Sequence, residues 1–252
     1  MDLELRGRKA LITGASAGIG LGIARSLARE GARLVLAART LDKLEAARAA
    51  LRAAHPGAEI DIEVCDVAVS ANIDALAERH LDLDILVNNA SSVPGGNLFE
   101  VDETRWRAGW DTKVFAYVNM CRRFYPLMAA KGGGVIVNIL GAGSLQKKWA
   151  YLCGGMGNAA LDFFTETLGA HSPEDNIRVV GVCPGPVATE RYQNITAQRA
   201  AAGIREPKAP FGRIATPDEI GDVVAFLASA RASYVSGSIQ VVDGGQSVAK
   251  IS

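Results

Sequence analysis

A glycine-rich turn near the N-terminus offers a place where phosphate groups can bind. Residues 9–13 are typical of a strand, and the segment TGASAGIG that begins at Thr13 leads from it into a helix. Glycines let the backbone turn tightly and let a pyrophosphate approach the amides, while the helix N-terminus supplies partial positive charge. The pattern predicts a dinucleotide at this turn, held by Gly14, Ser16, Gly18, Ile19 and Gly20.

The residue that follows the second predicted strand bears on which dinucleotide binds. A carboxylate at the end of strand 33–38 would accept hydrogen bonds from the ribose hydroxyls and repel a 2′-phosphate, but the chain has Ala38 followed by Arg39 there. An arginine pairs well with phosphate oxygens. We therefore predict NADP(H) as the cofactor, against the alternative that Arg39 is only a surface residue beside a helix start.

The rest of the chain predicts a sheet that brings these residues together. Short β-rich runs alternate with longer segments of helical period, such as 18–30, 41–54 and 158–170. The predicted strands are 9–13, 33–38, 59–64, 84–87, 135–140, 178–183 and 238–242. Strands separated by crossover helices form a parallel sheet that is covered on both faces. We expect an α/β, single-domain, doubly wound (Rossmann-type) fold with a seven-stranded parallel sheet over residues 1–252.

Composition narrows the class of protein. The 252 residues include 27 basic and 27 acidic side chains, so the formal net charge is zero, which gives no electrostatic footprint for nucleic acid or an anionic membrane. No apolar stretch reaches the length of a membrane span, the charged segment 1–8 is unlike a secretory signal, and the four cysteines lie far apart. We expect a cytoplasmic enzyme with free thiols and no metal site, because the three histidines are not spaced as ligands.

The glycine spacing GxxxGxG resembles the turn of the short-chain dehydrogenase/reductase family, and further segments in the same order are similar to that family's landmarks. Asp66 and Val67 resemble its adenine contact, while Asn89 and Ala90 lie in a segment like its NNAG, with Ser91 in place of the last glycine. The PGxxxT segment that meets the nicotinamide carboxamide is matched by Pro184, Gly185, Val187 and Thr189. The resemblance covers nearly the whole chain and implies this fold, a dinucleotide cofactor and a homo-oligomer, either a dimer or a tetramer.

The resemblance breaks at the catalytic residues. Most members of the family use an asparagine, a serine, a tyrosine and a lysine for acid–base chemistry beside the hydride carrier. An ungapped alignment puts other residue types at those four places, in the same order: Lys113, Gly141, Gly154 and Asn158. The alternative lets Tyr151 keep the tyrosine role, which needs a shorter loop before it. In either case the YxxxK pattern is absent.

Lysine and asparagine thus look exchanged between two neighbouring helices, with Lys113 on one and Asn158 on the other. We hypothesise that Lys113 supplies positive charge near the nicotinamide ribose and that Tyr151, about one helical turn before the expected place, supplies the hydroxyl. The ammonium would lower the tyrosine pKa. Ser144 is a candidate to replace the lost serine by reaching back. The plain alternatives are a solvated helix lysine, a packing aromatic and a turn residue.

The stretch 189–215 lacks a clear period and is longer than most connections, which is typical of a lid over a substrate. Four basic residues in it either steer an anionic substrate or only solvate the loop: Arg191, Arg199, Arg205 and Lys208. A helix should follow, because Thr216 can cap it, Pro217 can take the first position and Glu219 can reach back to the cap amide.

The leading interpretation is an NADP(H)-dependent oxidoreductase that acts on a carbonyl or secondary alcohol of a small molecule with a rearranged acid–base site. Loss of YxxxK leaves two alternatives open. One is a non-redox enzyme, such as a lyase, hydratase or hydrolase, that uses bound NADP structurally or electrostatically. The other is a catalytically silent NADP(H)-binding subunit. Substrate-dependent consumption of NADPH would separate the leading interpretation from both.

Overall fold

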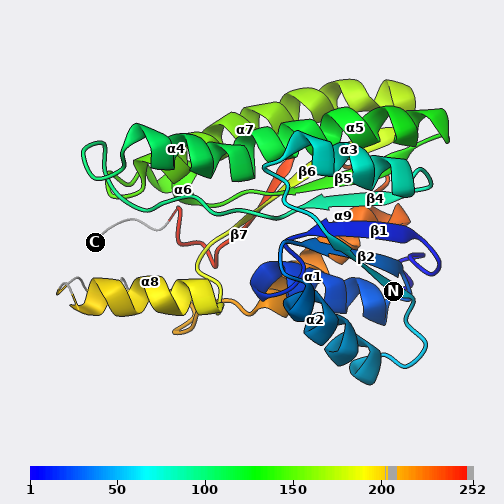
Figure 1. Ribbon diagram of the computed structural model, residues 1–252, viewed down its shortest axis with the longest axis horizontal. Coiled ribbons are helices and arrows are strands. Elements are labelled where there is room, and N and C mark those ends of the chain that lie inside the picture. Colours follow the sequence, from blue (N-terminus) through cyan, green and yellow to red (C-terminus); the bar gives the residue numbers. More distant parts are fainter. Residues whose placement is uncertain (202, 204–208, 249–252) are drawn as a thin grey trace.

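The strands form one parallel sheet of seven. The computed structural model describes residues 1–201, 203 and 209–248, and there the strands are β1 (Lys9–Thr13), β2 (Arg33–Ala38), β3 (Ile60–Val64), β4 (Ile85–Asn88), β5 (Gly134–Ile139), β6 (Ile177–Pro184) and β7 (Ile239–Val242). Their order across the sheet is β3-β2-β1-β4-β5-β6-β7 (Figure 1). The chain reverses direction across the sheet between β1 and β4, and such switch points are where α/β sheets bind ligands.

Alternating side chains along the strands build the two cores. Leu34 and Leu36 of β2 belong to the core on one face, whereas Val35 and Ala37 belong to the core on the other. This period of two buries a strand on both faces. The first face is covered by α1 (Gly18–Arg29), α2 (Leu41–Ala54) and α9 (Pro217–Ala228), and the second by α3 (Ser70–Arg79), α5 (Ala116–Ala130) and α7 (Leu152–His171) (Figure 1).

A π-helical turn lies between α4 (Glu103–Trp110) and α5 in one continuous helical segment. α4 runs into this turn, η1 (Asp111–Phe115), which continues without a break into α5. Asp102 caps the start of α4 by accepting a hydrogen bond from the Arg105 amide at 2.9 Å. π-turns within helices are frequent at functional sites. Lys113 lies in this turn.

Helices α1 and α9 approach each other closely. Thr216 and Glu219 form the predicted capping box at the start of α9, which is therefore confirmed. A Cβ at Gly22 would lie 2.5 Å from the Pro217 carbonyl oxygen, and one at Gly221 would lie 2.6 Å from the Gly22 carbonyl oxygen. Only glycine allows this approach, so the start of α9 is fixed directly against the helix that follows the glycine-rich turn.

Each strand lies within one residue of its predicted bounds, but two helical segments differ from the prediction. Residues 190–201, expected within an irregular stretch, form α8 (Glu190–Ala201), so that expectation is wrong there. α7 begins at Leu152, ahead of the predicted 158–170, because the glycines in its first turns obscure the helical period. Within the described ranges, none of the helices is both long enough and apolar enough to cross a lipid bilayer.

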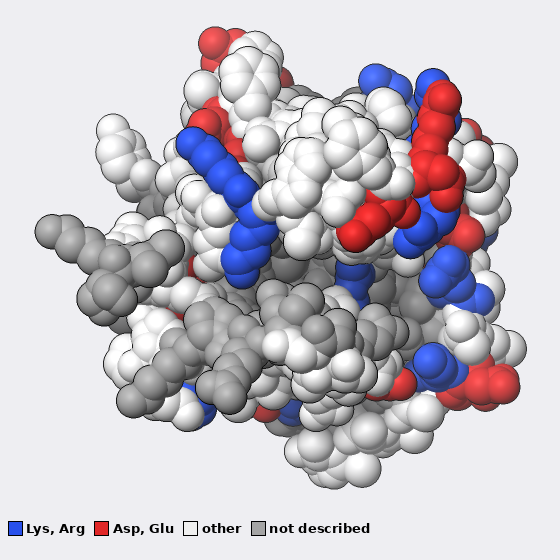
Figure 2. Space-filling model, turned by 90° about the vertical axis from the view of Figure 1, so that its left-hand side faces the viewer, with Lys and Arg blue, Asp and Glu red and all other residues white. Residues whose placement is uncertain are grey.

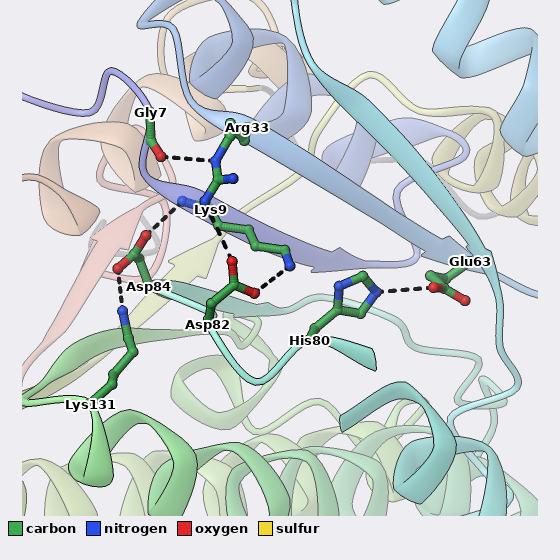
Figure 3. Close-up of polar contacts among 8 residues, drawn as sticks. All are labelled: Gly7, Lys9, Arg33, Glu63, His80, Asp82, Asp84 and Lys131. Atoms are coloured by element: carbon green, nitrogen blue, oxygen red, sulfur yellow. Dashed lines mark hydrogen bonds and ion pairs between the residues drawn. The ribbon is translucent and has the colours of Figure 1, made fainter. Parts of the chain in front are cut away.

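The amino-terminal end of the sheet carries a network of paired charges (Figure 3). The backbone amide of Lys9 donates to Asp84 at 2.8 Å, and the Lys131 ammonium pairs with the other oxygen of that carboxylate. Asp82 pairs with the Lys9 ammonium at 2.5 Å and with Arg33 at 3.6 Å. The hydrogen bond from Lys9 holds the pKa of Asp82 below its ordinary value. These pairs tie the start of β1 to the start of β4 and to the end of α5.

Candidate active site

The carboxyl ends of β1, β2, β4, β5 and β6 meet at the end of the sheet opposite the charge network. Figure 2 shows this end, where a hollow crosses the middle of the surface and basic side chains lie beside it. The short helix α6 (Gly143–Gln146), α4 and α8 surround the same end in Figure 1. Open α/β sheets bind ligands in the crevice outside the carboxyl ends of their strands. The candidate site is therefore at this end.

The glycine-rich turn is held in shape by the segment that follows β4. Thr13 Oγ1 accepts hydrogen bonds from the amides of Asn89 and Ala90 at 2.9 and 3.0 Å, and Asn89 Nδ2 donates to the Thr13 carbonyl at 2.8 Å. Gly14 and Gly18 adopt φ values of 67° and 56°, which side chains other than glycine rarely allow. Two of the predicted cofactor residues, Asn89 and Ala90, thus fix the geometry of the turn.

The first turn of α1 leaves its amides available to a ligand. Among the described residues no side chain caps this helix at Ala17, and its first turn contains no acidic residue. The segment therefore combines unpaired amide donors with the positive end of the helix dipole, beside Ser16, Ile19 and Gly20. This combination fits the pyrophosphate of a dinucleotide.

The segment 184–189 crosses from the end of β6 to the glycine-rich turn. Gly185, after Pro184, packs so closely on Asp243 that a Cβ there would lie 2.7 Å from the Asp243 Cβ. Val187 is buried and bridges to Ala215. Thr189 then reaches α1, where its Cγ2 lies 3.3 Å from the place that a Cβ of Gly18 would take. The structure thus brings the PGxxxT-like segment and the turn together.

The side chain of Arg39 leaves the carboxyl end of β2 and lines an open cavity of about 340 Å³. The guanidinium is exposed and makes no hydrogen bond or ion pair with the described part of the chain. Nearby, Asp66 follows β3 and accepts a hydrogen bond from the Ala68 amide at 3.0 Å, while Val67 is buried. A guanidinium without a protein partner at this place is suited to an anionic ligand.

Lys113 is buried at the site and has a lowered pKa. Its Nζ donates to the Leu140 carbonyl at 3.4 Å, just beyond β5, and the residue is only 5% exposed. Burial first, and then the charge of Arg191, lower the pKa of Lys113 to about 8, while the charge of Asp162 acts in the opposite sense. The interpretation of Lys113 as a solvated helix lysine is therefore wrong.

The Tyr151 ring folds back over Gly154, where the alignment expects a tyrosine. A Cβ at Gly154 would overlap the ring, and one at Gly143 would lie 2.9 Å from it. Burial raises the pKa of Tyr151, and the charge of Arg191 offsets only part of that effect. The expectation that Lys113 lowers this pKa is wrong, because desolvation of the phenol outweighs the cationic charge nearby. Tyr151 therefore keeps its proton at neutral pH.

Asn158 lies under the end of β5 with one polar atom unpaired. The residue is 1% exposed, and its Nδ2 lies 3.0 Å from the place that a Cβ of Gly141 would take. Its Oδ1 is buried without a hydrogen-bond partner, which costs free energy that a bound polar group would recover. Ser144 Oγ donates to the Gly141 carbonyl at 3.4 Å. The serine hydroxyl therefore lies beside the position that it was expected to reach.

Asp162 belongs to the site but carries no sequence motif. It follows Asn158 by one turn of α7, and its Oδ1 is also buried without a partner. Burial raises the pKa of Asp162, and the nearby Ser144 hydroxyl and the charge of Lys113 lower it only in part. The available signal was an acidic residue one turn after Asn158, on the face of a helix that otherwise packs on the sheet.

Arg191 also belongs to the site, in a role that differs from those considered from the sequence. Its guanidinium donates to the carbonyls of Ser91 and Val93 at 2.9 and 2.8 Å, so it ties the start of α8 to the loop after β4. Its positive charge acts on both Lys113 and Tyr151. The Arg199 side chain, Arg205 and Lys208 lie outside the described residues.

Two other features do not extend the site. The Tyr117 hydroxyl donates to the Ile139 carbonyl at 2.9 Å from a fully buried position, so this tyrosine anchors α5 to β5. A group of three histidine, cysteine, aspartate or glutamate side chains that could hold a metal ion does not occur in the part of the chain that the structure describes.

The fold and the glycine-rich turn define a Rossmann-type α/β protein. Comparisons with known proteins identify the family within this class. A family model described as enoyl-(acyl carrier protein) reductase matches residues 14–247. The chain belongs to the short-chain dehydrogenase/reductase family.

Two curated relatives and one crystal structure are similar to the chain over most of their length. Galactitol 2-dehydrogenase (L-tagatose-forming) from Cereibacter sphaeroides is 35% identical over 247 residues, which cover 97% of each chain. 2-keto-3-deoxy-L-fuconate dehydrogenase from Xanthomonas campestris pv. campestris is 31% identical, over 98% of this chain and 82% of the relative. The crystal structure of L-sorbose reductase from Gluconobacter frateurii, complexed with NADPH and L-sorbose, has a TM-score of 0.89 at 33% identity and covers 99% of this chain and 100% of that chain.

Proposed function

We propose that the chain is an NADP(H)-dependent oxidoreductase that interconverts a carbonyl and a secondary alcohol on a small, hydroxyl-rich molecule of the sugar or polyol type. Two relatives are named for such substrates, galactitol and L-sorbose, and the structure of the second contains NADPH. When bound, the nicotinamide supplies or accepts the hydride. The uncapped first turn of α1 would hold its pyrophosphate, and Arg39 its 2′-phosphate.

The observation that carries the proposal is the buried ammonium of Lys113 at the end of β5. With a pKa of about 8, Lys113 is mostly protonated at neutral pH, yet it can exchange its proton within the physiological range. It would stabilise the negative charge that develops on the substrate oxygen. This is a rearranged acid–base site, because the cation comes from η1 and not from α7.

The remaining polar groups have complementary roles in this proposal. Burial raises the pKa of Tyr151, so this tyrosine keeps its proton at neutral pH. It can donate that proton to the carbonyl oxygen of the substrate as the carbonyl is reduced to an alcohol. The Ser144 hydroxyl and the unpaired Oδ1 of Asn158 would orient the substrate by hydrogen bonds. Both lie close to Gly141, whose missing side chain lets the Asn158 amide approach the end of β5.

We propose further that the chain is one domain over 1–252 and that 189–215 acts as a substrate lid. The hydrogen bonds of Arg191 to the Ser91 and Val93 carbonyls would hold α8 closed over the site. Lids of this kind exclude water and complete the catalytic group.

A homo-oligomer is part of the same proposal. Large apolar side chains are exposed on η1 and α7: Phe115, Met156 and Phe163. Phe163 is the most exposed of these three side chains, at 72%. Exposed apolar patches mark interaction surfaces, so a second copy would cover these side chains. Analytical ultracentrifugation of the protein and of Phe163→Glu tests this, because the variant should dissociate if the patch is the interface.

The test of the function is consumption of NADPH by the purified protein in the presence of ketoses such as L-sorbose and L-tagatose. Substitution of Lys113 by Met and of Tyr151 by Phe should each lower kcat on the order of 10²-fold or more, because each removes a proton-transfer or charge-stabilising group. The Kd for NADPH should stay unchanged. Matched controls are Lys43→Met on the exposed face of α2 and Tyr125→Phe, whose hydroxyl bonds Asp175 away from the site.

Each contrary outcome has a distinct meaning. NADPH binding without turnover of any carbonyl or alcohol would contradict the oxidoreductase and favour a silent subunit. Product formation with unchanged nicotinamide would favour a non-redox enzyme. Full activity in both Lys113→Met and Tyr151→Phe would contradict the roles given to these residues.

A further inference from the structure

A second arginine faces the cavity that Arg39 lines. Arg105, which lies on α4, lines the same cavity. We propose that Arg105 and Arg39 together hold the 2′-phosphate of NADP(H), so that α4 takes part in choosing the cofactor. This inference rests on the proposed function, because it assigns a specificity-determining residue to the same cofactor site.

The two guanidinium groups are available for a ligand. Arg39 has no protein partner among the described residues. Arg105 uses one nitrogen, Nη1, which donates to the Glu100 carbonyl at 3.1 Å. Its other guanidinium nitrogens have no hydrogen bond or ion pair with the described part of the chain. Arg107, two residues further along α4, is by contrast paired with Glu103 at 2.8 Å.

The position of Arg105 is set by close packing of α4 on the loop after β4. A Cβ at Gly109 would lie 2.7 Å from the Pro94 Cδ, so the helix backbone rests on this loop. Asp102 fixes the first turn by accepting from the Arg105 amide. Arg105, one turn before Gly109, is therefore presented to the cavity by a helix whose place is fixed and not by a free loop.

The chemistry of the cavity wall favours a phosphate monoester. The wall contains two arginines and the polar residues Ser92 and Thr112, but no acidic residue. Two like charges around one cavity repel each other unless an anion lies between them. Guanidinium groups bind phosphate oxygens in a bidentate way, so two of them can engage the dianion from two sides. The 2′-phosphate is the group that distinguishes NADPH from NADH. Because Arg39 lines this cavity and would bind the 2′-phosphate, the phosphate would lie here.

The experiment compares the Kd for NADPH and for NADH, by calorimetry or by quenching of tryptophan fluorescence. Arg105→Ala should weaken NADPH binding about tenfold, as expected for loss of one charge-assisted contact, and should leave NADH binding unchanged. Adenosine 2′,5′-bisphosphate, used as a competitor that lacks nicotinamide, should lose affinity by the same factor. Arg39→Ala should have a similar selective effect.

Two further variants separate charge from structure. Arg105→Gln keeps a donor for the Glu100 carbonyl, and it should lose NADPH affinity as Arg105→Ala does. Arg107→Ala, on the same helix but outside the cavity wall, should leave both affinities unchanged. Equal melting temperatures of the variants and the parent protein confirm that the fold is intact.

The outcomes are decisive and distinguish this inference from the proposed function. Preserved NADPH affinity in Arg105→Ala and Arg105→Gln, or equal losses for NADPH and NADH, would overturn the role of Arg105 while the proposed function remained. A parent protein that binds neither dinucleotide would overturn the proposed function and this inference with it.

Discussion

The two ends of the sheet treat their charged groups in opposite ways. At the amino-terminal end, the carboxylates of Asp82 and Asp84 pair with lysine and arginine side chains (Figure 3). At the carboxyl end, Arg39 has no partner among the described residues, Lys113 makes one long hydrogen bond, and Asn158 Oδ1 is buried without a partner. At one end the carboxylates are paired within the fold, whereas the other end presents polar groups without a protein partner.

The paired charges at the amino-terminal end stabilise the fold, whereas the unpaired polar groups at the carboxyl end are available to bind a ligand. Unpaired buried polar groups cost free energy, so natural proteins retain them mainly where function needs them. His80 is an exception at the paired end, because its Nε2 contacts Glu63 at 3.0 Å while its Nδ1 has no partner. Removal of the carboxylate of Asp84 at one end and of the ammonium of Lys113 at the other should consequently change stability in opposite directions, and two further substitutions have smaller effects.

The largest effect is expected for Asp84→Ala at the paired end. The variant should lower the free energy of unfolding by about 3 kcal/mol, because it leaves the Lys9 amide and the Lys131 ammonium without their shared, mostly buried partner. Urea denaturation measures the loss, and the Kd for NADPH should not change. Asp61→Ala, an exposed carboxylate on β3, is the control. A stability change no larger than that of the control would contradict the contrast between the ends.

Lys113→Met at the other end should have the opposite sign. At pH 7 it should raise the free energy of unfolding by about 2 kcal/mol, because it removes a buried charge whose desolvation outweighs its hydrogen bond to Leu140. The pKa of Lys113 is about 8 when folded and lies near its ordinary, higher value when unfolded. The parent protein therefore gains stability as the pH rises from about 8 towards 10, and the advantage of the variant shrinks there.

Unfolding curves of both proteins at pH 7 and in the alkaline range check this prediction. Lys43→Met, which removes an exposed lysine, should show no such dependence on pH. A Lys113→Met variant that is less stable than the parent protein at pH 7 would mean that the ammonium is well paired in the folded state.

A smaller effect is expected where glycine makes room for the Tyr151 ring. Gly154→Ala should destabilise the protein by about 1–2 kcal/mol, because the added methyl overlaps the ring and displaces it. In a Tyr151→Ala background the same substitution should cost little, since the overlap is gone. A double-mutant cycle measures the coupling. Additive effects of the two substitutions would show that the ring does not occupy this space.

The smallest effect is expected for Lys9→Met, which removes the exposed pair with Asp82. The loss should be about 0.5 kcal/mol or less near pH 7, because exposed ion pairs are screened by solvent and salt. The pKa of Asp82 is lowered in the folded state, so its contribution is present above the ordinary value and disappears as the pH falls through the folded pKa. Parent and variant should thus differ near neutrality and converge in acid. A difference that persists in acid or in high salt would point to lost packing of the lysine stem.

The sheet could be predicted from the sequence because its signals are local. Residues 34–38 are apolar on both faces of the strand, which is typical of a strand covered by helices on both sides. The glycine-rich turn and Arg39 were found for the same reason, since the turn needs glycine and the strand end fixes the place of Arg39. α8 could not be found, because ERYQNITAQRAA is polar nearly all around and offers no apolar stripe.

The inner part of the site depends on contacts that no local pattern encodes. Asp162 matters only because folding brings it to Ser144 and to the field of Lys113, which are distant in the chain. The sign of the Tyr151 pKa shift was missed for a related reason. A sequence shows that a tyrosine and a lysine are both present, but the degree of burial that decides between desolvation and attraction is a property of the fold.

The contact between α1 and α9 has a consequence for how the protein is made. Ser26 of α1 donates to Asp222 of α9 at 2.7 Å across 196 residues of sequence, and glycines at Gly22 and Gly221 bring the two backbones together. During synthesis, the helix behind the glycine-rich turn emerges from the ribosome long before its partner. Contacts between such distant segments slow folding, so the N-terminal half should remain incompletely packed until almost the whole chain is available.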